Sequence, residues 1–529
     1  MKVLKSYEMA EIDRLTIQKT GINSLVLMEN AGRTASEIIL DRYRDKKIFV
    51  VVAGSGNNGG DGLVVARYLK LYGKDVKVFI LSKSEDRLSD DNKANLKVLR
   101  NIGINPVFIN DENLNLLEEG LKDAEVIIDA IFGTGFKPPV KGYRENAIKL
   151  INNYGKSIVA IDIPSGLSTD VGNIEGTYIN ADLTITFAYP KLAHILFPSS
   201  LKCGDIYVID ISIDRKYSEN IKREILNFSN ISLPVRYRDS HKYTYGHTLI
   251  IGGSVGKTGA VIMSAKSSSA IGSGLVSVVI PSTLNQIFEI SLTEEMSIPV
   301  KDTGNGYFSK EAYKDIKNVV DNGKYTSIAL GMGMSVYKDG KDLVKNILEN
   351  IDLPILIDAD GLNNLSQISD FKDILRSREG NTVLTPHIGE MARLTGLNSK
   401  DIINNMEDVA KKFAEETKST VVLKGSRTVI ATDDGEIYYS IRGTEGMATA
   451  GTGDILAGLT ASLIYRLGIK EGVKAGVFIH GLAGEFATEK KHKESVKATD
   501  LIDFIPNVLK YIEMEKEKVY YKFFVKLYK

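Results

Sequence analysis

The sequence predicts an α/β protein built from two folded domains, and three observations carry this prediction. At 529 residues the chain exceeds the size at which a single hydrophobic core keeps growing, about 250 to 300 residues. In both halves, short runs rich in Val and Ile alternate with amphipathic helical stretches, a pattern typical of parallel sheets covered by helices on both faces. A polar, aperiodic stretch between residues 213 and 245 separates the two series, and we expect the linker there.

The first element in chain order is a helix that breaks at Thr20 and Gly21 and restarts behind an Asn23–Ser24 cap. From Lys47 onward, strands and helices alternate. The successive strings are KIFVVVA, DGLVVARYLKLYG, VKVFIL, DNKANLKVLRNIG, AEVIIDAIFG and KSIVAIDIPSG, closing with ADLTITFA and GDIYVIDIS. Continuous apolar strands separated by helices predict a Rossmann-like domain with three αβα layers.

We place the domain boundary near Arg223, so that residues 1–223 form the first domain and residues 224–510 the second. The second α/β series has more β-hairpin character. Its strings are HTLIIGG, TGAVIMSAKSSSAIGSG, LVSVVIP, YTSIALGMG, LPILIDADG, NTVLTP, STVVLKG, RTVIATDDG and DILAGLTASLIYRLG.

Residues 511–529 form a charged, aromatic tail that stands apart from both domains. Its apolar residues are compatible with one stripe: Val519, Tyr520, Phe523, Phe524 and Leu527. Packing on its own domain is the favoured use of this stripe, ahead of a subunit contact and a membrane surface.

Composition excludes several classes of partner. Lys plus Arg and Asp plus Glu number 67 each, so no global field attracts nucleic acid or an anionic membrane. The single cysteine, Cys203, excludes an internal disulfide and a multi-cysteine metal site. The N-terminus lacks the apolar segment of a signal peptide, and no apolar run approaches the roughly 18 to 20 residues needed to span a bilayer. We therefore expect a soluble, cytosolic protein.

The first candidate site is the string GSGNNGGDG, which follows a strand and precedes a helix. It contains GxGxxG at Gly54, Gly56 and Gly59, and such glycines let a backbone approach a pyrophosphate at a helix N-terminus. A dehydrogenase would also need an acidic residue after the second strand, where Ser82 and Lys83 stand instead. A plain tight turn is the alternative.

Two further loops follow strands of the same domain. Asp129 ends VIID and Asp162 ends IVAID. An isolated Asp at a strand end is more often a helix cap or a turn former. Three loops converging on one sheet edge, where open α/β sheets bind ligands, favour a functional site.

The strings LMENAG, GSGNNGGDG, DAIFGTGF and IDIPSG, in this order, resemble the NAD(P)H-hydrate epimerase family over nearly all of residues 1–215. The resemblance implies that Asp162 is the acid/base and that Asn58, Asp129 and Ser165 bind K⁺, for which oxygen ligands are suited. It also implies a dinucleotide pocket made of Asn57, Asn58, Gly59, Gly60, Asp61, Gly133, Thr134, Gly135, Phe136, Lys137, Pro138, Pro139, Tyr143 and Asp162.

Two well-known motifs nearly occur in the second half, in IGGSVGKTGA. A Walker A loop would need glycine where Ile251 stands, so we reject a P-loop. The same string fits GxSxG around Ser254, the signature of a hydrolase elbow. This alternative stays open, although local context identifies no partner among His387 and His480.

A stronger candidate is MATAGTGDILAGLTASLI. Gly451, Thr452 and Gly453 would present backbone N–H groups at a helix start, a place that stabilises negative charge. Asp454 in the first turn could then take a proton from a substrate hydroxyl during phosphoryl transfer. As a lone motif, it would also fit an ordinary acidic residue of a first helical turn.

This region resembles the ribokinase-like fold and, within it, the NAD(P)H-hydrate dehydratases. The matching strings, over roughly residues 240–505, are HTLIIGGSVGKTGA, LGMGM, DADGLN, TPHIGEMARL, VVLKGSRTVI, GMATAGTGD, HGLAG and ATDLI. The resemblance places Ala260, Gly333, His387 and Asp454 on the damaged dinucleotide. It places Lys424, Gly425, Ser426, Arg427, Thr428 and Gly453 on the adenine nucleotide. Taken alone, His387 would be read as a loop histidine.

The two resemblances imply repair of NADH or NADPH hydrated at the nicotinamide ring. The first domain would interconvert the two epimers, and the second would phosphorylate the ring hydroxyl at the expense of ADP and eliminate the phosphate, with Mg²⁺ neutralising the phosphates. We expect a homo-oligomer with small-molecule substrates only. The alternatives are a small-molecule kinase and a regulatory nucleotide-binding protein without turnover.

Overall fold

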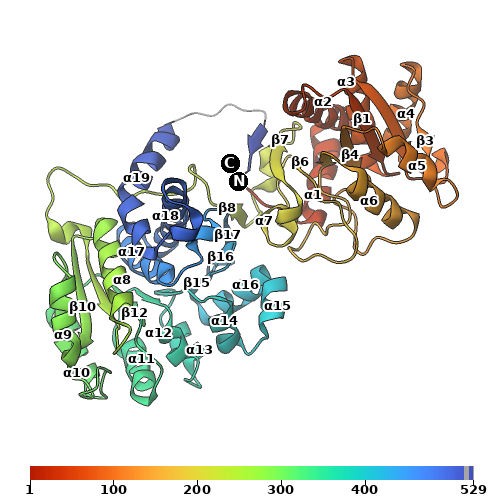
Figure 1. The fold of residues 1–529 in the computed structure, drawn as a ribbon. Helices are drawn as coiled ribbons and strands as arrows, with labels where there is room; N and C mark the ends of the chain where they lie inside the picture. The colour runs from red at the N-terminus through yellow and green to blue at the C-terminus, as the bar shows by residue number, and fades with distance from the viewer. Residues whose placement is uncertain (518–523, 528–529) are drawn as a thin grey trace. The chain divides into compact units, whose positions relative to one another are not determined.

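The computed structural model describes residues 1–517 and 524–527. The chain divides into two compact units. The first comprises Met1–Ile221 together with a C-terminal strand, β18 (Phe524–Lys526), and the second begins at Lys222. Each unit contains its own sheet (Figure 1). No helix among the described residues is both long and apolar enough to cross a bilayer.

The sheet of the first unit has the strand order β18-β7-β6-β5-β4-β1-β2-β3. Its other strands are β1 (Ile48–Ala53), β2 (Asp75–Ile80), β3 (Val107–Phe108), β4 (Val126–Ala130), β5 (Ile158–Ile161), β6 (Leu183–Phe187) and β7 (Asp205–Ile209). All pairs are parallel except β18 with β7. The order reverses between β1 and β4, and open sheets of this kind bind ligands at such a reversal.

The helices of this unit are α1 (Ser6–Leu15), α2 (Ser24–Arg42), α3 (Asn57–Leu71), α4 (Asp90–Asn101), α5 (Leu114–Leu121), α6 (Tyr143–Tyr154) and α7 (Leu192–Ile195). Helices α1 to α4 occupy the stretches that the sequence predicts as helical, although α3 begins at Asn57 and not at Asp61, and α5, α6 and α7 were not predicted. A π-helical turn continues α1 and ends at Gly21, whose φ is +79°. The Asn23 side chain accepts a hydrogen bond from the Leu25 N–H at 2.9 Å, which confirms the predicted cap.

Alternation along β1 explains the three layers of the first unit. Phe49 and Val51 belong to the cluster that includes apolar residues of α2, α3 and α4. Val50 and Val52 belong to the cluster formed with α5 and α6 on the other face. Because successive side chains of a strand point to opposite faces, an unbroken apolar run requires a helical layer on each side.

The second unit contains a ten-stranded sheet in the order β11-β10-β9-β12-β13-β14-β15-β16-β17-β8. Its strands are β8 (Arg223–Ile225), β9 (His247–Ile251), β10 (Leu275–Pro281), β11 (Met296–Val300), β12 (Ser327–Leu330), β13 (Ile355–Ile357), β14 (Thr382–Leu384), β15 (Thr420–Leu423), β16 (Thr428–Ala431) and β17 (Ile437–Ser440). The strands are parallel from β11 to β15, and β15, β16 and β17 form an antiparallel meander. This meander is the predicted hairpin character.

The predicted linker is not irregular throughout. Strand β8 lies inside it and pairs in parallel with β17, with Ile225 opposite Tyr439. Ile225 and Leu226 are buried. Two apolar residues in an otherwise polar segment are therefore enough for it to pair with the edge of the sheet. Such a strand of three residues has no periodicity that sequence analysis could detect.

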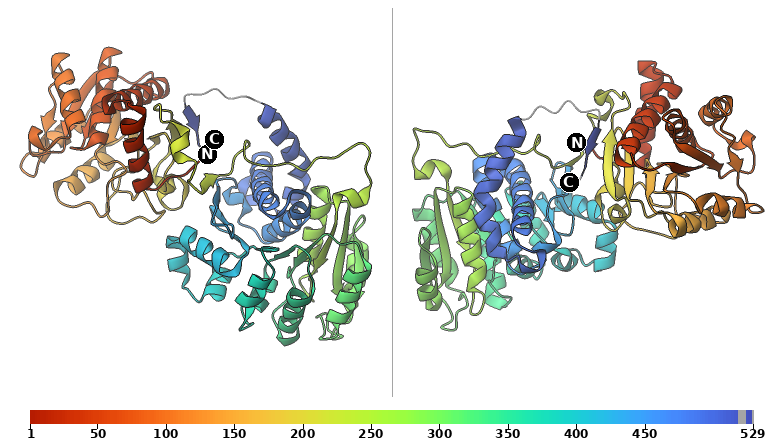
Figure 2. Two further views of the ribbon diagram at one scale, coloured as in Figure 1. Left: turned by 180° about the vertical axis from the view of Figure 1, so that it is seen from behind. Right: turned by 45° about the horizontal axis from the view of Figure 1, so that its top comes forward.

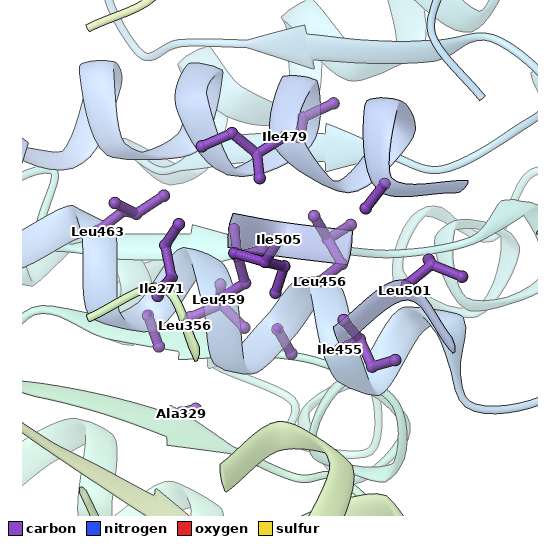
Figure 3. Packing of buried hydrophobic residues seen from close by; sticks show 14 of the residues in the cluster. Ile271, Ala329, Leu356, Ile455, Leu456, Leu459, Leu463, Ile479, Leu501 and Ile505 are labelled. Atoms are coloured by element: carbon purple, nitrogen blue, oxygen red, sulfur yellow. The ribbon is translucent and has the colours of Figure 1, made fainter. Parts of the chain in front are cut away.

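The helices of the second unit are α8 (Thr258–Ala270), α9 (Asn285–Ser291), α10 (Ala312–Asn322), α11 (Lys338–Asn350), α12 (Asp360–Leu365), α13 (Phe371–Ser377), α14 (Ile388–Thr395), α15 (Ser399–Asn404), α16 (Met406–Thr417), α17 (Thr452–Leu467), α18 (Ile469–Lys490) and α19 (Ala498–Glu517). The largest core cluster surrounds α17. Leu456 and Leu459 of α17 pack between Ile479 of α18 and the strand residues Ala329 and Leu356 (Figure 3). A helix buried on all sides must be apolar all round, and this core anchors the N-terminus of α17.

The C-terminal segment differs from the predicted separate tail. Helix α19 continues beyond position 511, and Ile512 is buried in the core of the second unit. Strand β18 lies beside β7 in the first unit (Figures 1 and 2), and Leu527 packs against the cluster that includes Ile163. The predicted packing on its own domain is therefore wrong for β18, because the edge of β7 offers unpaired backbone groups. Val519, Tyr520 and Phe523 lie outside the described residues.

Candidate active sites

A cavity of about 590 Å³ opens at the carboxyl ends of β1, β4, β5 and β6 in the first unit. The residues that line it are Met9, Asp13, Gly54, Ser55, Gly56, Asn57, Asn58, Asp61, Ile131, Phe132, Gly133, Thr134, Gly135, Phe136, Arg144, Asp162, Phe187, Lys191 and Ile211. The three loops that sequence analysis expected to converge therefore do so.

Not every predicted pocket residue lines this cavity. Gly59 and Gly60 instead let α3 approach its neighbours, since an added Cβ on Gly59 would lie 2.0 Å from the Gly54 carbonyl oxygen. The Tyr143 hydroxyl donates to the Leu81 carbonyl at 3.3 Å and is buried. The residues of the predicted pocket outside the cavity lining are Gly59, Gly60, Lys137, Pro138, Pro139 and Tyr143.

Asp162 is held at the cavity by a buried network. Its backbone has φ of +66°, a strained conformation that marks functional sites in many proteins. Its Oδ1 accepts hydrogen bonds from Lys191 Nζ at 2.6 Å and from Thr186 Oγ1 at 3.0 Å. Burial opposes ionisation, but the Lys191 ammonium and these hydrogen bonds outweigh it and lower the pKa of Asp162. Asp162 is therefore an ionised, positioned carboxylate.

Two more carboxyl groups line the same cavity. Burial raises the pKa of Asp13 to about 6, against the pull of Lys191 and with the repulsion of Asp162. Burial and the charge of Asp162 also raise the pKa of Asp61. Sequence analysis missed Lys191 and Asp13. Lys191 follows strand β6 as Asp162 follows β5, which is a usable signal, whereas Asp13 on α1 has none.

The predicted K⁺ ligands are connected by hydrogen bonds to one another and to Phe132, whose N–H donates to Ser165 Oγ at 2.9 Å. Asp129 is fully buried and accepts hydrogen bonds from the Ser165 hydroxyl at 2.6 Å and the Ser165 N–H at 2.8 Å. Asn58 Nδ2 donates to the Phe132 carbonyl at 3.0 Å. The Oδ1 atom of Asn58 is buried and makes no hydrogen bond among the described residues. A buried amide oxygen that accepts no hydrogen bond and a buried carboxylate are both ligands that suit a cation bound by oxygen atoms.

In the second unit, three neighbouring strands lead into titratable side chains. Asp358 follows β13, the loop with His387 follows β14, and Lys424 follows β15. Lys424 Nζ donates to Asp358 Oδ1 at 2.5 Å, and Asp358 is buried. An added Cβ on Gly453 would lie 3.4 Å from Lys424 Nζ, so this ion pair sits beside the glycine loop of α17.

Asp454 lies in the first turn of α17, behind Gly451 with φ of +98°. Burial and the charge of Asp358 raise the pKa of Asp454 to about 7, against the pull of Lys424. A group that titrates near neutral pH is suited to general base catalysis. Asp358 was not singled out in the sequence, although it lies in the matching string DADGLN.

His387 caps helix α14, with its Nδ1 accepting from the Gly389 N–H at 2.9 Å. Glu390 completes the capping box by accepting from the His387 N–H at 2.8 Å. Burial raises the pKa of Glu390 to about 7, and burial together with Lys424 lowers that of His387. The predicted dinucleotide contact His387 is thus a neutral ring, about half exposed, beside Lys424.

The remaining predicted residues of the second site lie on two loops. Gly333 and Ala260 are adjacent, since an added Cβ on Gly333 would lie 3.2 Å from the Ala260 Cβ. Lys424 leads into the turn before β16, which contains the exposed Gly425 and Ser426. The other residues predicted to bind the nucleotide here, Arg427 and Thr428, complete this turn and begin β16. Within this segment, Lys424 is the residue that hydrogen-bonds the Asp358 side chain.

The hydrolase alternative fails on geometry. Ser254 is fully buried, and its hydroxyl hydrogen-bonds the Gly333 carbonyl at 2.7 Å and the Ser335 hydroxyl at 2.8 Å. His480 Nε2 lies 2.8 Å from the Thr452 carbonyl oxygen. Ser254 is thus bound to structural partners with no histidine among its recorded hydrogen bonds, whereas an elbow serine is exposed next to a base.

The first unit has a cavity at the strand-order reversal of its sheet, where α/β proteins bind dinucleotides. The second has a helix N-terminus that suits an anion, beside Asp454, whose pKa lies near neutral pH. Together these features define an enzyme with two nucleotide sites. The NAD(P)H-hydrate dehydratase family matches residues 248–507, and the YjeF-related protein N-terminus family matches residues 24–193. The chain belongs to the family of bifunctional NAD(P)H-hydrate repair enzymes.

Individual relatives span the whole chain. The bifunctional NAD(P)H-hydrate repair enzyme of Moorella thermoacetica is 37% identical over 98% of each chain, and that of Thermofilum pendens is 34% identical over 100% of each. Among solved structures, the ADP/ATP-dependent NAD(P)H-hydrate dehydratase of Bacillus subtilis is 27% identical, covers 53% of this chain and 95% of its own, and gives a TM-score of 0.47. The yeast protein YNL200c is 30% identical over 42% of this chain and 93% of its own, with a TM-score of 0.37.

Family membership confirms the resemblances noted in the sequence. It also confirms the predicted fold class, a Rossmann-like domain followed by a ribokinase-like domain, and the combination of an isomerase with a lyase in one enzyme.

Proposed function

We propose that the first unit interconverts the two epimers of hydrated NADH and NADPH and that Asp162 is its acid/base. The observation that supports this assignment is the ionised Asp162 carboxylate at the wall of a cavity of about 590 Å³. The loops Asn57–Asn58 and Gly133–Phe136 line the same cavity, and Gly133 and Gly135 of the second loop let a dinucleotide approach the protein backbone.

In the second unit, Asp454 removes the proton from the ring hydroxyl of one epimer while that oxygen attacks the terminal phosphoryl group of ADP. Lys424 beside Gly453 places a positive charge where the transferring group lies. AMP leaves in this transfer, and elimination of the phosphate together with a proton from the neighbouring ring carbon then restores the double bond of NAD(P)H. Ala260, Gly333 and His387 hold the dinucleotide, and the turn Lys424–Thr428 holds the nucleotide.

Two cations belong to this proposal. Asn58, Asp129 and Ser165 would hold K⁺, which would neutralise the charge of the buried Asp129 carboxylate. Mg²⁺ accompanies the nucleotide in the second unit and offsets the charge of its phosphates. The acidic groups whose charges raise the pKa of Asp454 are Asp358 and Asp360, and Asp358 is already paired with Lys424.

The test of the second activity uses hydrated NADH, ADP and Mg²⁺ with the full chain, and follows the near-ultraviolet absorbance of the dihydronicotinamide ring. We expect the wild type to restore this absorbance and Asp454→Asn to lose it by about 10² to 10⁴ in rate while still binding ADP. A stable phosphate ester without recovery of absorbance would identify a small-molecule kinase instead. Binding without any turnover would identify a regulatory protein.

The test of the first activity uses an equal mixture of epimers with excess ADP. The wild type should recover essentially all of the absorbance. Asp162→Asn should recover about half in a fast phase, followed by the spontaneous epimerisation rate. Recovery of both epimers at the wild-type rate would contradict the role of Asp162.

Assembly and compartment are also part of the proposal. We propose that the protein forms a homo-oligomer, measurable by light scattering coupled to gel filtration, and that it works in the cytosol on small-molecule substrates alone.

A further inference from the structure

The epimerase cavity contains more acid/base groups than one catalytic aspartate needs. Asp13, Asp61 and Asp162 all line it, together with Lys191. These residues come from α1, from α3, from the end of β5 and from the start of α7, so the fold brings four distant parts of the chain to one cavity. The inference drawn from this cluster rests on the proposed epimerase activity of the first unit.

The two oxygens of Asp162 have different surroundings. Oδ1 accepts from both Lys191 Nζ and Thr186 Oγ1. For Oδ2, no hydrogen bond is recorded among the described residues, and it faces the cavity loop, since an added Cβ on Gly133 would lie 3.5 Å from it. Lys191, which is 1% exposed, therefore keeps the carboxylate charged and leaves one oxygen open toward a bound molecule.

Asp13 differs from Asp162 in its partners. Its side chain makes no hydrogen bond or ion pair that is recorded among the described residues, although it lines the cavity. Burial raises its pKa to about 6, with Lys191 opposing and Asp162 adding to the shift. The charges that act on it are those of Lys191 and Asp162, Asp13 in turn acts on Asp61 of α3, and Arg144 of α6 lines the same cavity. Asp13 thus carries a proton at a higher pH than Asp162 does.

Inversion at the carbon that bears the hydroxyl requires two transfers. The C–O bond breaks as an acid protonates the hydroxyl, and the ring nitrogen supplies its electron pair to form an iminium ion. A water molecule then adds to the opposite face and gives its proton to a base. The net change is one proton moved from the acid to the base, and water is both released and consumed.

We propose that Asp13 is the second catalytic residue of the epimerase, protonating the departing hydroxyl while the free Oδ2 of Asp162 accepts the proton of the attacking water. Lys191 is the positioning residue that assigns the two roles. In the reverse direction the roles exchange.

The test follows one purified epimer without nucleotide, so that the dehydratase half cannot turn over, in isotopically labelled water. The full-length wild type should interconvert the epimers and exchange the hydroxyl oxygen with solvent at a matching rate. Asp13→Asn should slow both processes by about 10² to 10⁴ while the KM stays within a few-fold. Glu11→Gln, an exposed neighbour on the same helix, is the matched control and should leave both rates unchanged.

The pH profile separates catalysis from structure. The wild-type rate should fall above about pH 6 as Asp13 loses its proton, and Asp13→Asn should lack this descending limb while Asp13→Glu keeps it. Lys191→Met should move the ascending limb to higher pH, because Asp162 loses its counter-charge. If Asp13→Asn does not fold, the limb retained by Asp13→Glu decides the matter.

Three results have distinct meanings. A normal rate in Asp13→Asn with a dead Asp162→Asn overturns the role of Asp13 and leaves the proposed epimerase intact. Epimerisation without oxygen exchange overturns the C–O cleavage step. A wild type that interconverts no epimers refutes the proposed function itself.

Discussion

The dehydratase site makes a quantitative prediction about pH. Asp454 must be ionised to accept the proton of the ring hydroxyl, and burial together with Asp358 raises its pKa to about 7. For a single titrating base of that pKa, the ionised fraction rises from about one tenth at about pH 6 to about nine tenths at about pH 8. We therefore expect kcat at saturating ADP and Mg²⁺ to increase roughly tenfold over this interval.

The perturbation that tests the cause is Asp358→Asn. It removes the negative charge that raises the pKa of Asp454. It also removes the anionic partner of Lys424, so the Lys424 ammonium is free to interact with Asp454. Both changes favour the ionised form, so the midpoint of the profile should move to lower pH. Asp370→Asn, which removes an exposed carboxylate paired with Lys345, is the control and should not move the midpoint.

The assay follows recovery of the dihydronicotinamide absorbance from the substrate epimer. The rate of absorbance change in the absence of enzyme is subtracted at each pH. The amplitude in Asp358→Asn should fall as well, because Lys424 loses its anchor, so the informative quantity is the midpoint. A flat wild-type profile between about pH 6 and about pH 8, or a midpoint that rises in Asp358→Asn, would refute the assignment of Asp454 as the base.

Three further predictions concern other parts of the molecule. Asp129→Ala should weaken dinucleotide binding and abolish any K⁺ dependence of the epimerase, without changing the dehydratase activity. An epimerase whose response to K⁺ is unaltered in this variant would show that the cation site is misplaced. Gly59→Ala should destabilise the first unit by about 1 to 3 kcal/mol in urea unfolding, because the new Cβ would lie 2.0 Å from the Gly54 carbonyl oxygen. Gly56→Ala is the control: its Cβ would enter open space, and the variant should unfold as the wild type does. Arg378→Met should cost the second unit about 3 kcal/mol or more, because the buried guanidinium donates to three main-chain carbonyl groups, and an unchanged unfolding midpoint would contradict this reading.

Local chemistry explains why much of the fold can be predicted. The unbroken apolar run of β1 requires helices on both faces whatever the rest of the chain does. Asn23 caps α2 through an oxygen placed two residues before the N–H it accepts from, so both partners lie within the same few letters. Strand β8 and strand β18 were not predictable in this way, because each depends on a distant sheet edge that is open.

The candidate sites divide along the same line. Gly54 to Asp61, Asp129, Asp162 and Asp454 are recognisable because each stands directly at a strand end or a helix start, where parallel sheets and helix termini place ligands. What those groups do depends on neighbours far away in the chain.

The sequence by itself determined the two α/β domains, the family and the positions of the catalytic loops, because each follows from residues close together in the chain. Only the tertiary structure decided the protonation state of the aspartates. Lys191 lies 29 residues from Asp162 and Lys424 lies 66 residues from Asp358. A pKa is set by burial and by charges within a few ångströms in space, and neither quantity can be read from spacing along the chain.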